Sequence, residues 1–429
     1  MSLAYQELVT DGLVASNPRS GLRVNEEMQE ALRASFSRMA EDAVATGPEW
    51  RRLLPPVHDP FLDIIKPDDW VRYPYPFLYG QPCIEGFPHA GWMRALRRSL
   101  EHPHETFSLR DAASADDPWL VELLCNHILP ARGIDVRPDH VLLTLGAQHA
   151  LHLVVSAVVP AGADVGLETP GYADAAHIVA RAGATVVPFE VDAGGLIVED
   201  RVRAMRAMYV TPSHQSPTGA TMHSARRRQL IEQANRGGTF IIEDDYDSEF
   251  RYEGRPMPAL KADDHAGYVI YIGSFSKFLA PGIRLGFVVA DPEFIDYLRR
   301  MRRYMVRHPP GQIQRALAIL IDSGDYQRAV QKTRRVLRRR WMTLSSALAR
   351  HMPWPVSVPT GGTSVWVEGP DSLDSRALLE SARRAGVLIE QGEMFSLSNA
   401  SLRHCFRLGF TAIPESRIEA GVRILASLL

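Results

Sequence analysis

Short apolar runs alternate with helix-length segments between residues 120 and 290, and this alternation constrains the fold more than any other feature of the chain. Residues 239–245 (TFIIEDD) have the length of a buried strand, and residues 224–238 (SARRRQLIEQANRGG) have the length of a helix that ends at glycine. Strands separated by helices are typical of a layered α/β domain with a mostly parallel sheet. The pattern predicts a seven-stranded sheet formed by residues 140–146, 164–169, 184–191, 207–212, 239–245, 268–274 and 284–290.

The sequence after residue 291 predicts a second, smaller α/β domain. A basic helical region extends to about residue 349, and the strand-like runs VWVEG, VLIEQ and CFRLGF follow it with helices between and after them. A chain of 429 residues is long enough for two packed lobes. We therefore expect a large domain over residues 69–310 and a small C-terminal domain over residues 311–429.

The first 68 residues have a different pattern. Residues 2–14 (SLAYQELVTDGLV) predict a helix and residues 16–24 (SNPRSGLRV) predict a hairpin, and together they form a unit over residues 1–25. Residues 26–68 contain one predicted helix and then the proline-rich stretch PPVHDPFLDIIKP, so we interpret them as a linker.

Composition and charge exclude several classes of protein. Apolar residues make up 45% of the chain, and the formal net charge of −2 gives no support for nonspecific nucleic-acid binding. Cys83, Cys125 and Cys405 lack CxxC spacing, so they indicate neither a disulfide framework nor a metal site. The chain has no signal-peptide pattern and no apolar run of the roughly 18 residues that cross a bilayer. We expect a cytoplasmic protein with no membrane attachment.

Polar side chains at the ends of two predicted strands form a candidate site. Asp244 and Asp245 follow TFII, and Lys277 follows YVIYIGS. The carboxyl ends of parallel strands meet at a ligand crevice. A carboxylate there can keep a pyridine nitrogen protonated, Tyr246 can bind the phenolic oxygen of the same ring, and the lysine can form a Schiff base with an aldehyde cofactor. Asp244 is preferred to Asp245 as the carboxylate, and the alternatives are a solvated acidic loop and a surface lysine.

Such a cofactor also carries a phosphate group. Hydroxyl and guanidinium groups close to the lysine can bind it, and so can backbone N–H groups at the strand–helix junction of residues 143–153. The candidate phosphate-binding residues are Gly146, Ala147, Gln148, Ser274, Ser276 and Arg284. Because strand–glycine–helix junctions are common, this junction indicates a phosphate site only together with the other candidate phosphate-binding residues.

Three more residues are candidates for contacts with the ring and the substrate. Tyr172 follows a predicted strand, where its ring can stack on a cofactor or simply occupy a turn. Ser216 belongs to the polar loop TPSHQSPTG, which can approach the ring edge or only connect a strand to a helix. Arg407 in CFRLGF alternates with apolar residues, so it projects either into the cleft to bind a carboxylate or toward solvent.

Taken together, SHQSPTG, IIEDDYDSEFRYEGRPMPAL, GSFSKFLAPGIRLGF and FRLGF resemble the class I/II, fold-type I aminotransferases that depend on pyridoxal 5'-phosphate. In particular they are similar to the aminotransferase-like domain of MocR-type regulators of the GntR family. The resemblance covers roughly residues 70–429, and residues 209–286 carry its most specific motifs.

The resemblance implies a role for each candidate residue. Lys277 would hold the cofactor as the internal aldimine, Asp244 would face the pyridine nitrogen and Tyr246 the phenolic oxygen. Tyr172 would lie over the ring, and Arg407 would bind the α-carboxylate of the substrate. The two serines and the arginine named above would bind the phosphate, and the active site would be shared between the subunits of a homodimer.

Residues 4–24 (AYQELVTDGLVASNPRSGLRV) resemble the recognition helix and wing that end a GntR-type winged-helix domain. A winged helix that lacks its first two helices cannot brace the recognition helix on DNA, so we expect DNA binding only where a complete winged helix lies upstream. A late start site, a truncated chain and a chain that has lost its regulatory half are the alternatives for this sequence.

The sequence departs from the family pattern at two positions. Ser216 stands where most members have asparagine, and Phe107 stands roughly where a tyrosine is contributed across the dimer. We therefore carry two main functions forward. The first is an aminotransferase that moves an amino group between an amino acid or amine and a 2-oxo acid, and the second is a transcriptional regulator that senses pyridoxal phosphate and an amino compound. A non-catalytic relic of the fold is the third alternative.

Overall fold

The structure is a computed structural model that describes two compact units of the chain, one within residues 1–58 and the other within residues 59–429. The residues described are 2–17, 21–25, 27–28, 30–31, 33–35, 61–62, 66–81, 83–254, 257–277, 279–398 and 402–429.

The first unit contains a helix followed by a two-stranded antiparallel sheet, as the sequence predicts. Helix α1 (Ser2–Thr10) ends before Gly12, whose φ of 71° lies in the left-handed region that glycine tolerates. Strand β1 (Val14–Asn17) then pairs with β2 (Gly21–Val24). The turn that contains Pro18 lies outside the described residues, as does much of the predicted linker of residues 26–68.

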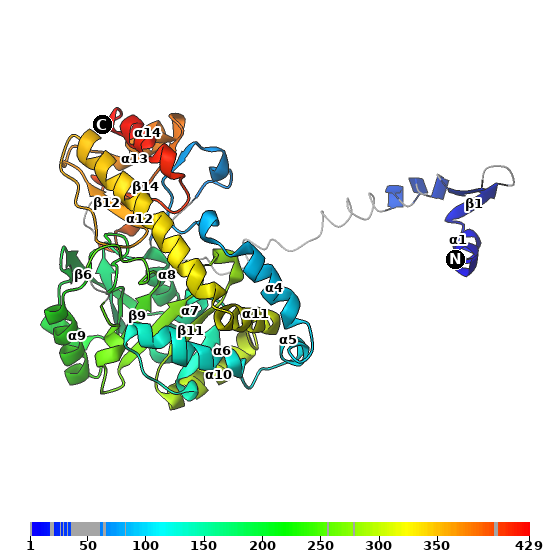
Figure 1. The fold of residues 1–429 in the computed structure, drawn as a ribbon, viewed down its shortest axis with the longest axis horizontal. Coiled ribbons are helices and arrows are strands. Elements are labelled where there is room, and N and C mark those ends of the chain that lie inside the picture. Colours follow the sequence, from blue (N-terminus) through cyan, green and yellow to red (C-terminus); the bar gives the residue numbers. More distant parts are fainter. Residues whose placement is uncertain are drawn as a thin grey trace. The chain divides into compact units, whose positions relative to one another are not determined.

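The second unit is built on an eight-stranded sheet with the order β4-β11-β10-β9-β8-β5-β6-β7 (Figure 1). The five strands from β10 to β6 are parallel, whereas β11 runs antiparallel to both of its neighbours and β7 runs antiparallel to β6. The strands are β4 (Val141–Thr144), β5 (Asp164–Thr169), β6 (Thr185–Asp192), β7 (Gly195–Leu196), β8 (Ala207–Val210), β9 (Phe240–Asp245), β10 (Val269–Ser274) and β11 (Gly286–Val289). The predicted strands are therefore all present, and the short β7 extends one edge.

Helices cover both faces of this sheet. Because adjacent strand residues point to opposite faces, Leu142 packs into a core with α7, α8 and α10, whereas Leu143 packs into a core with α6 and α11. Helix α9 covers the second face near β8 and β9, where Leu230 packs with Ile241. The helices of this layer are α4 (His89–Ser99), α5 (Glu105–Leu109), α6 (Pro118–Leu123), α7 (Ala147–Val158), α8 (Ala173–Arg181), α9 (Ser224–Gly237), α10 (Pro292–Met305) and α11 (Gly311–Asp322).

The basic helical region predicted after residue 291 consists of three helices, α10, α11 and α12 (Asp325–His351). Pro309 and Pro310 precede α11, and Gly324 with a φ of 73° precedes α12. The long α12 joins two cores, because its Tyr326 packs beneath the large sheet while Leu344 packs into the C-terminal lobe (Figure 1).

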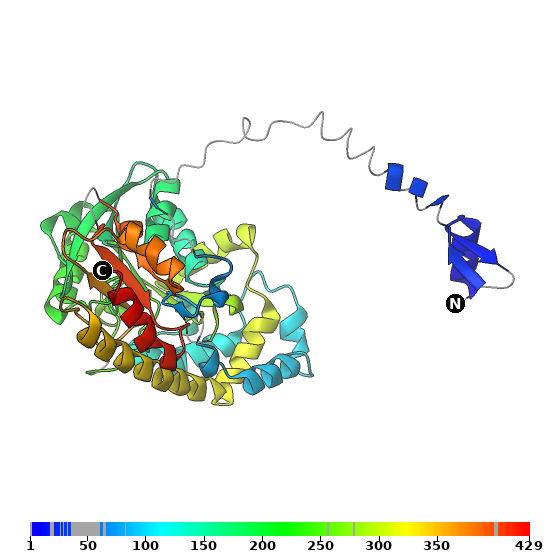
Figure 2. The same ribbon diagram turned by 90° about the horizontal axis from the view of Figure 1, so that it is seen from above.

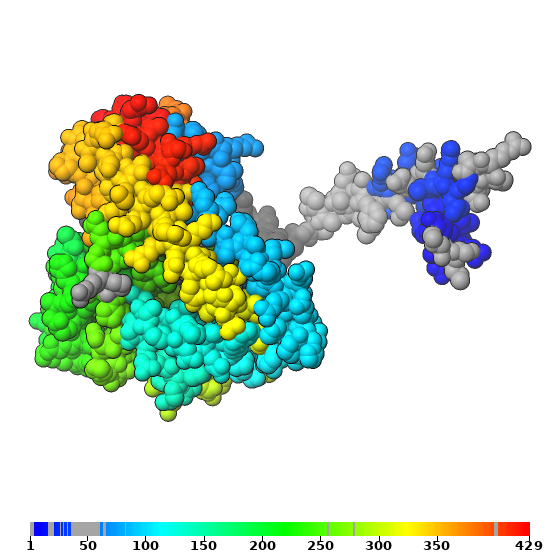
Figure 3. Space-filling model, in the orientation of Figure 1, coloured from blue at the N-terminus to red at the C-terminus, as the bar shows by residue number. Residues whose placement is uncertain are grey.

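The C-terminal lobe contains a three-stranded antiparallel sheet with the order β12-β15-β14 and two helices packed on it. A second small sheet pairs β13 with β3, so residues 75 and 76 join a lobe that is built mainly from residues after 325 (Figure 2, Figure 3). Phe77, Cys83, Phe250 and Tyr252 also pack into its core. The elements are β3 (Tyr75–Pro76), β12 (Ser364–Glu368), α13 (Ser375–Arg384), β13 (Val387–Leu388), β14 (Glu390–Gln391), β15 (Cys405–Gly409) and α14 (Glu415–Ala426). In the described part of the chain, no helix combines the length and apolarity that a membrane span requires.

The segment after β3 is held against β15 by a close backbone contact at Gly409. The Gly409 amide donates to the carbonyl oxygen of Phe77 at 3.0 Å. A β-carbon at Gly409 would lie 2.3 Å from the carbonyl carbon of Leu78 and 2.4 Å from the amide nitrogen of Tyr79. Glycine at this position therefore lets residues 77–79 lie directly on the strand.

Gly409→Ala should lower the free energy of unfolding by roughly 2 kcal/mol or more, because the atoms in its way are backbone atoms that cannot rotate aside. Urea denaturation followed by circular dichroism measures this change. Gly282→Ala is the matched control, since no atom of the described residues lies within 4 Å of its β-carbon position and its φ is not left-handed. Equal stability of the two variants would contradict the close packing of β15 on residues 77–79.

Candidate functional site

A cavity of about 340 Å³ opens at the carboxyl ends of the central strands, which is a common size for a small-molecule site. Except for Gly146, each site residue expected from the sequence lines it. The lining residues are Lys66, Tyr79, Gly80, Ala147, Gln148, Leu151, Tyr172, Asp174, Tyr209, Ser216, Asp244, Tyr246, Ser274, Ser276, Lys277, Pro281, Arg284 and Arg407.

The end of β9 places neighbouring carboxylates on opposite faces of the sheet, as strand geometry requires. Asp244 faces the cavity. Asp245 faces the other side, where it forms a buried ion pair with Arg132 at 2.7 Å and accepts the hydroxyl of Tyr271 at 2.7 Å. Burial raises the pKa of Asp245, but the Arg132 charge and the hydrogen bonds to the carboxylate together hold it below its usual value. Asp245 is therefore committed to structure, and Asp244 is the carboxylate available to a ligand.

Asp244 is buried, and only one of its two carboxylate oxygens has a hydrogen-bond partner among the described residues. Its Oδ2 atom accepts the hydroxyl of Tyr209 at 2.8 Å, while Oδ1 has no hydrogen-bond partner within the described residues. Burial raises the pKa of Asp244 to about 6, and the Tyr209 hydrogen bond opposes that rise. A buried acceptor without a partner is uncommon, and a protonated ring nitrogen in the cavity would satisfy it.

Lys277 lies three residues after β10 and its Nζ atom is 4.1 Å from the centre of the Tyr79 ring. Burial lowers the pKa of Lys277, and the positive charges of Lys66 and Arg407 act in the same direction, so that the pKa is about 8. Of the four lysines in the sequence, only Lys66 and Lys277 line this cavity within the described residues. A substantial fraction of the Lys277 amine is therefore neutral, and hence nucleophilic, near pH 8.

One end of the cavity is arranged to accept an anion. Gly146, with a φ of 84°, precedes α7, and a β-carbon there would lie only 3.1 Å from the Nη2 atom of Arg284. Arg284 donates to the carbonyl oxygen of Leu145 at 2.8 Å, so its guanidinium group lies beside the helix N-terminus. The hydroxyl of Ser276 is buried and has no partner in the described part of the chain, whereas the Ser274 hydroxyl accepts the Ser276 amide at 3.2 Å. An anion here would meet a guanidinium group, a free hydroxyl and the N-terminal amides of a helix.

Two tyrosines border the middle of the cavity. Tyr246 donates its hydroxyl to the carbonyl oxygen of His214 at 2.9 Å, which leaves its phenolic oxygen free to accept. The Tyr172 hydroxyl lies 2.9 Å from both the side-chain oxygen of Gln148 and a carboxylate oxygen of Asp174. The contacts expected of Tyr246 and Tyr172 with a cofactor ring stay predictions.

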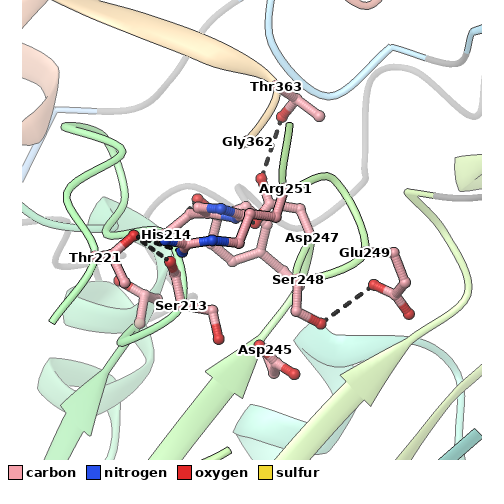
Figure 4. Close-up of polar contacts among 12 residues, drawn as sticks. Ser213, His214, Thr221, Asp245, Asp247, Ser248, Glu249, Arg251, Gly362 and Thr363 are labelled. Carbon is pink, nitrogen blue, oxygen red and sulfur yellow. Dashed lines mark hydrogen bonds and ion pairs between the residues drawn. The ribbon is translucent and has the colours of Figure 1, made fainter. Parts of the chain in front are cut away.

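A buried histidine–aspartate pair lies next to the segments that carry Ser216 and Tyr246 (Figure 4). His214 Nδ1 lies 2.8 Å from a carboxylate oxygen of Asp247, and both side chains are 2% exposed. Thr363 from the C-terminal lobe donates to the other oxygen of Asp247 at 3.4 Å. The pair ties the loop that carries Ser216 to the residue that follows Tyr246. Sequence reasoning missed it, although His214 and Asp247 both lie within the motifs that it singled out.

Arg407 lies on β15, lines the cavity and forms a buried ion pair with Glu390. Its Nε atom lies 2.8 Å from a carboxylate oxygen of Glu390, and both side chains are 2% exposed. Glu390 is directly opposite Arg407 in the register of β14 and β15. The guanidinium carbon is 4.1 Å from the centre of the Tyr79 ring and 4.4 Å from that of Phe395. Sequence reasoning missed Glu390, for which the only signal is a carboxylate inside the apolar run VLIEQ.

Phe107 lies on α5 and does not line the cavity of this chain. The guanidinium carbons of Arg315 and Arg110 lie 4.1 Å and 4.6 Å from the centre of its ring. Its position relative to the active site of a second subunit stays a prediction.

Comparisons with known proteins agree with this geometry. The family model described as aminotransferase class I and II matches residues 113–425. The chain is 34% identical to the HTH-type transcriptional regulator TauR of Rhodobacter capsulatus, covering 100% of this chain and 88% of TauR. It is 30% identical to the probable rhizopine catabolism regulatory protein MocR of Rhizobium meliloti, covering 89% and 76% of the two chains.

A solved structure gives the same fold. The kynurenine aminotransferase of Pyrococcus horikoshii, solved in complex with PMP, superposes with a TM-score of 0.79 at 28% identity. The match covers 90% of this chain and 95% of that enzyme. The fold class expected from the sequence is thereby confirmed.

Tyr209→Phe should raise the pKa of Asp244 from about 6 to about 7 or above, because it removes a hydrogen bond that favours the ionised carboxylate. An infrared titration of the carboxyl band in the cofactor-free protein measures this, with Asp244→Asn identifying the band. Tyr271→Phe is the control, since Tyr271 donates to Asp245 instead. An unchanged Asp244 midpoint in Tyr209→Phe would contradict the role given to this hydrogen bond.

Proposed function

Because this chain belongs to the class I and II aminotransferase family, we propose that it transfers an amino group between an amino acid and a 2-oxo acid. The observation that carries this proposal is the pairing of Lys277 and Asp244 across one cavity. Lys277 is an amine with a pKa lowered to about 8, and Asp244 is a buried carboxylate with an unpartnered oxygen. A cofactor aldehyde requires the lysine amine, and a pyridine nitrogen requires the carboxylate.

Pyridoxal 5'-phosphate is the cofactor that membership of this family implies, and the residues of the cavity fit it. The free Oδ1 of Asp244 suits a protonated ring nitrogen, and the free hydroxyl of Ser276 with the adjacent Arg284 suits a phosphate. When bound, the cofactor supplies a protonated pyridine ring that withdraws electrons from the bonds of the substrate α-carbon.

Lys277 has two tasks in this proposal. Its amine would hold the cofactor through the aldehyde carbon, and the lowered pKa makes the neutral, nucleophilic form of that amine available near physiological pH. The same Nζ atom would act as the base that accepts the proton of the substrate α-carbon and as the acid that gives it back. Asp244, held by Tyr209, keeps the ring nitrogen protonated through its negative charge.

The other lining residues orient the reactants. Ser274, Ser276, Arg284 and the amides that follow Gly146 would hold the phosphate. Tyr172 would stack on the ring, and Tyr246 and Ser216 would contact its phenolic oxygen. Arg407 binds the α-carboxylate through its terminal amino groups, because its Nε atom is already paired with Glu390.

A regulator is the second candidate function, and the likeness to TauR and MocR favours it. Helix α1 is followed by the paired strands β1 and β2, the order expected of a recognition helix and wing. In this proposal residues 1–25 contact DNA as the end of a complete winged helix, and residues 26–68 link it to a sensor made of residues 69–310 and 311–429. For either function we propose a cytoplasmic homodimer whose subunits share the active site.

Lys277→Ala should abolish the covalent attachment of pyridoxal 5'-phosphate and preserve the fold. Borohydride reduction followed by peptide mass spectrometry measures attachment, and circular dichroism measures folding. Lys332→Ala, which changes an exposed lysine of α12, is the matched control. In the unmodified chain the rate of attachment should rise with pH about a midpoint near 8 instead of 10.5, because only the neutral amine reacts. A reducible adduct that survives in Lys277→Ala would contradict the assignment.

The cofactor-loaded protein should lose its visible absorbance when an amino-acid substrate is added and recover it when a 2-oxo acid follows. This full cycle is what an aminotransferase performs, and a screen of amino acids and amines by absorbance measures it. A spectral change that no 2-oxo acid reverses would favour the sensor instead. Lys277→Ala is the control for changes that do not pass through the lysine.

A further inference from the structure

Lys66 is a second lysine of the cavity to which the proposed chemistry gives no task. Lys66 precedes residues 77–79, the segment that packs on β15, and its ammonium donates to the carbonyl oxygen of Tyr79. Among the described residues, no carboxylate forms an ion pair with it. Burial lowers the pKa of Lys66, and the negative charge of Glu390 partly opposes that effect. A partly buried ammonium that has no counter-ion among the described residues loses hydration without receiving an opposite charge from them in return.

Lys66 is one of three cationic side chains that surround Tyr79. The Tyr79 ring centre lies 4.1 Å from the guanidinium carbon of Arg407, 4.1 Å from Nζ of Lys277 and 5.9 Å from Nζ of Lys66. Both lysine nitrogens also lie within 3.2 Å of the point that a β-carbon on Gly80 would occupy. The absence of a side chain at Gly80 therefore lets both ammonium groups reach the cavity.

The partners available to these three cations differ. Lys277 is used by the cofactor, and Arg407 is neutralised at its Nε edge by Glu390, which leaves its terminal edge for one carboxylate. An amino acid with a single carboxylate would thus satisfy Arg407 and leave Lys66 unpaired. A ligand with a second anionic group would pair both, with its amino group directed at Lys277 between them.

We propose that Lys66 binds a second acidic group of the substrate or effector, so that this cavity selects amino acids whose side chain is anionic. The inference rests on the proposed function, since it assigns the α-carboxylate to Arg407. It adds the substrate class, which the assignment of cofactor and lysine leaves open.

Calorimetry on the cofactor-loaded full chain tests this without requiring any reaction. The probes are the linear dicarboxylic acids of four to six carbons, each compared with its own monoamide, which has nearly the same shape and one charge fewer. The variants are Lys66→Met, which keeps the length of the side chain and removes its charge, and Lys66→Arg, which keeps the charge.

We expect at least one dicarboxylate to bind the unmodified chain ten-fold or more tightly than its monoamide. Lys66→Met should reduce that ratio to about two or less and leave the affinity for the monoamide unchanged, whereas Lys66→Arg should retain most of it. Cofactor affinity should be the same in all three proteins when it is measured well above pH 8, where the Lys277 amine is largely neutral and the charge of Lys66 no longer alters its protonation.

The proposal is overturned if the unmodified chain prefers none of the dicarboxylic acids to its monoamide, including the case in which neither compound of a pair binds. It is also overturned if Lys66→Met keeps the preference, or if it weakens dicarboxylate and monoamide equally, which would place Lys66 on the α-carboxylate. A drop in cofactor affinity would place Lys66 on the phosphate instead. Failure of the proposed function appears separately, as a cofactor that borohydride does not fix to Lys277 in the unmodified chain.

Discussion

The separation of two adjacent carboxylates at the end of β9 is the constraint on which the rest of the site depends. Strand geometry directs Asp245 toward Arg132 and Tyr271, and Asp244 toward the cavity. The first can be buried because its charge is balanced, which keeps the end of the strand in place. The second keeps an unused acceptor and a raised pKa, so the charge that β9 presents to a ligand comes from one residue alone.

Much of the fold was predictable from local sequence, because the strands are buried on both faces and appear as short apolar runs between helices. Two features were not. The two-residue β7 is too short to leave a pattern, and the pairing of β3 with β13 joins residues more than 300 positions apart. The C-terminal lobe therefore takes in Tyr75, which no periodicity in the sequence assigns to it.

Some residues of the site were likewise predictable from the sequence, and others were not. Lys277, Asp244 and Arg284 were predictable because the chemistry of one ligand requires their residue types near the ends of neighbouring strands. Glu390, Lys66 and Tyr79 were not, because each depends on a tertiary contact. Glu390 meets Arg407 through the register of two short strands. Tyr79 belongs to the segment held on Gly409, and Lys66 donates to the carbonyl oxygen of Tyr79.

The Arg407–Glu390 pair has a consequence for how mutagenesis of this cavity is interpreted. Both groups are almost fully buried, so replacing the arginine alone strands an anion in a poorly hydrated place. A lost activity would then mix a folding defect with a recognition defect. The two residues form one thermodynamic unit, and only a double-mutant cycle that also converts the glutamate to glutamine separates ligand binding from the internal electrostatics of the lobe.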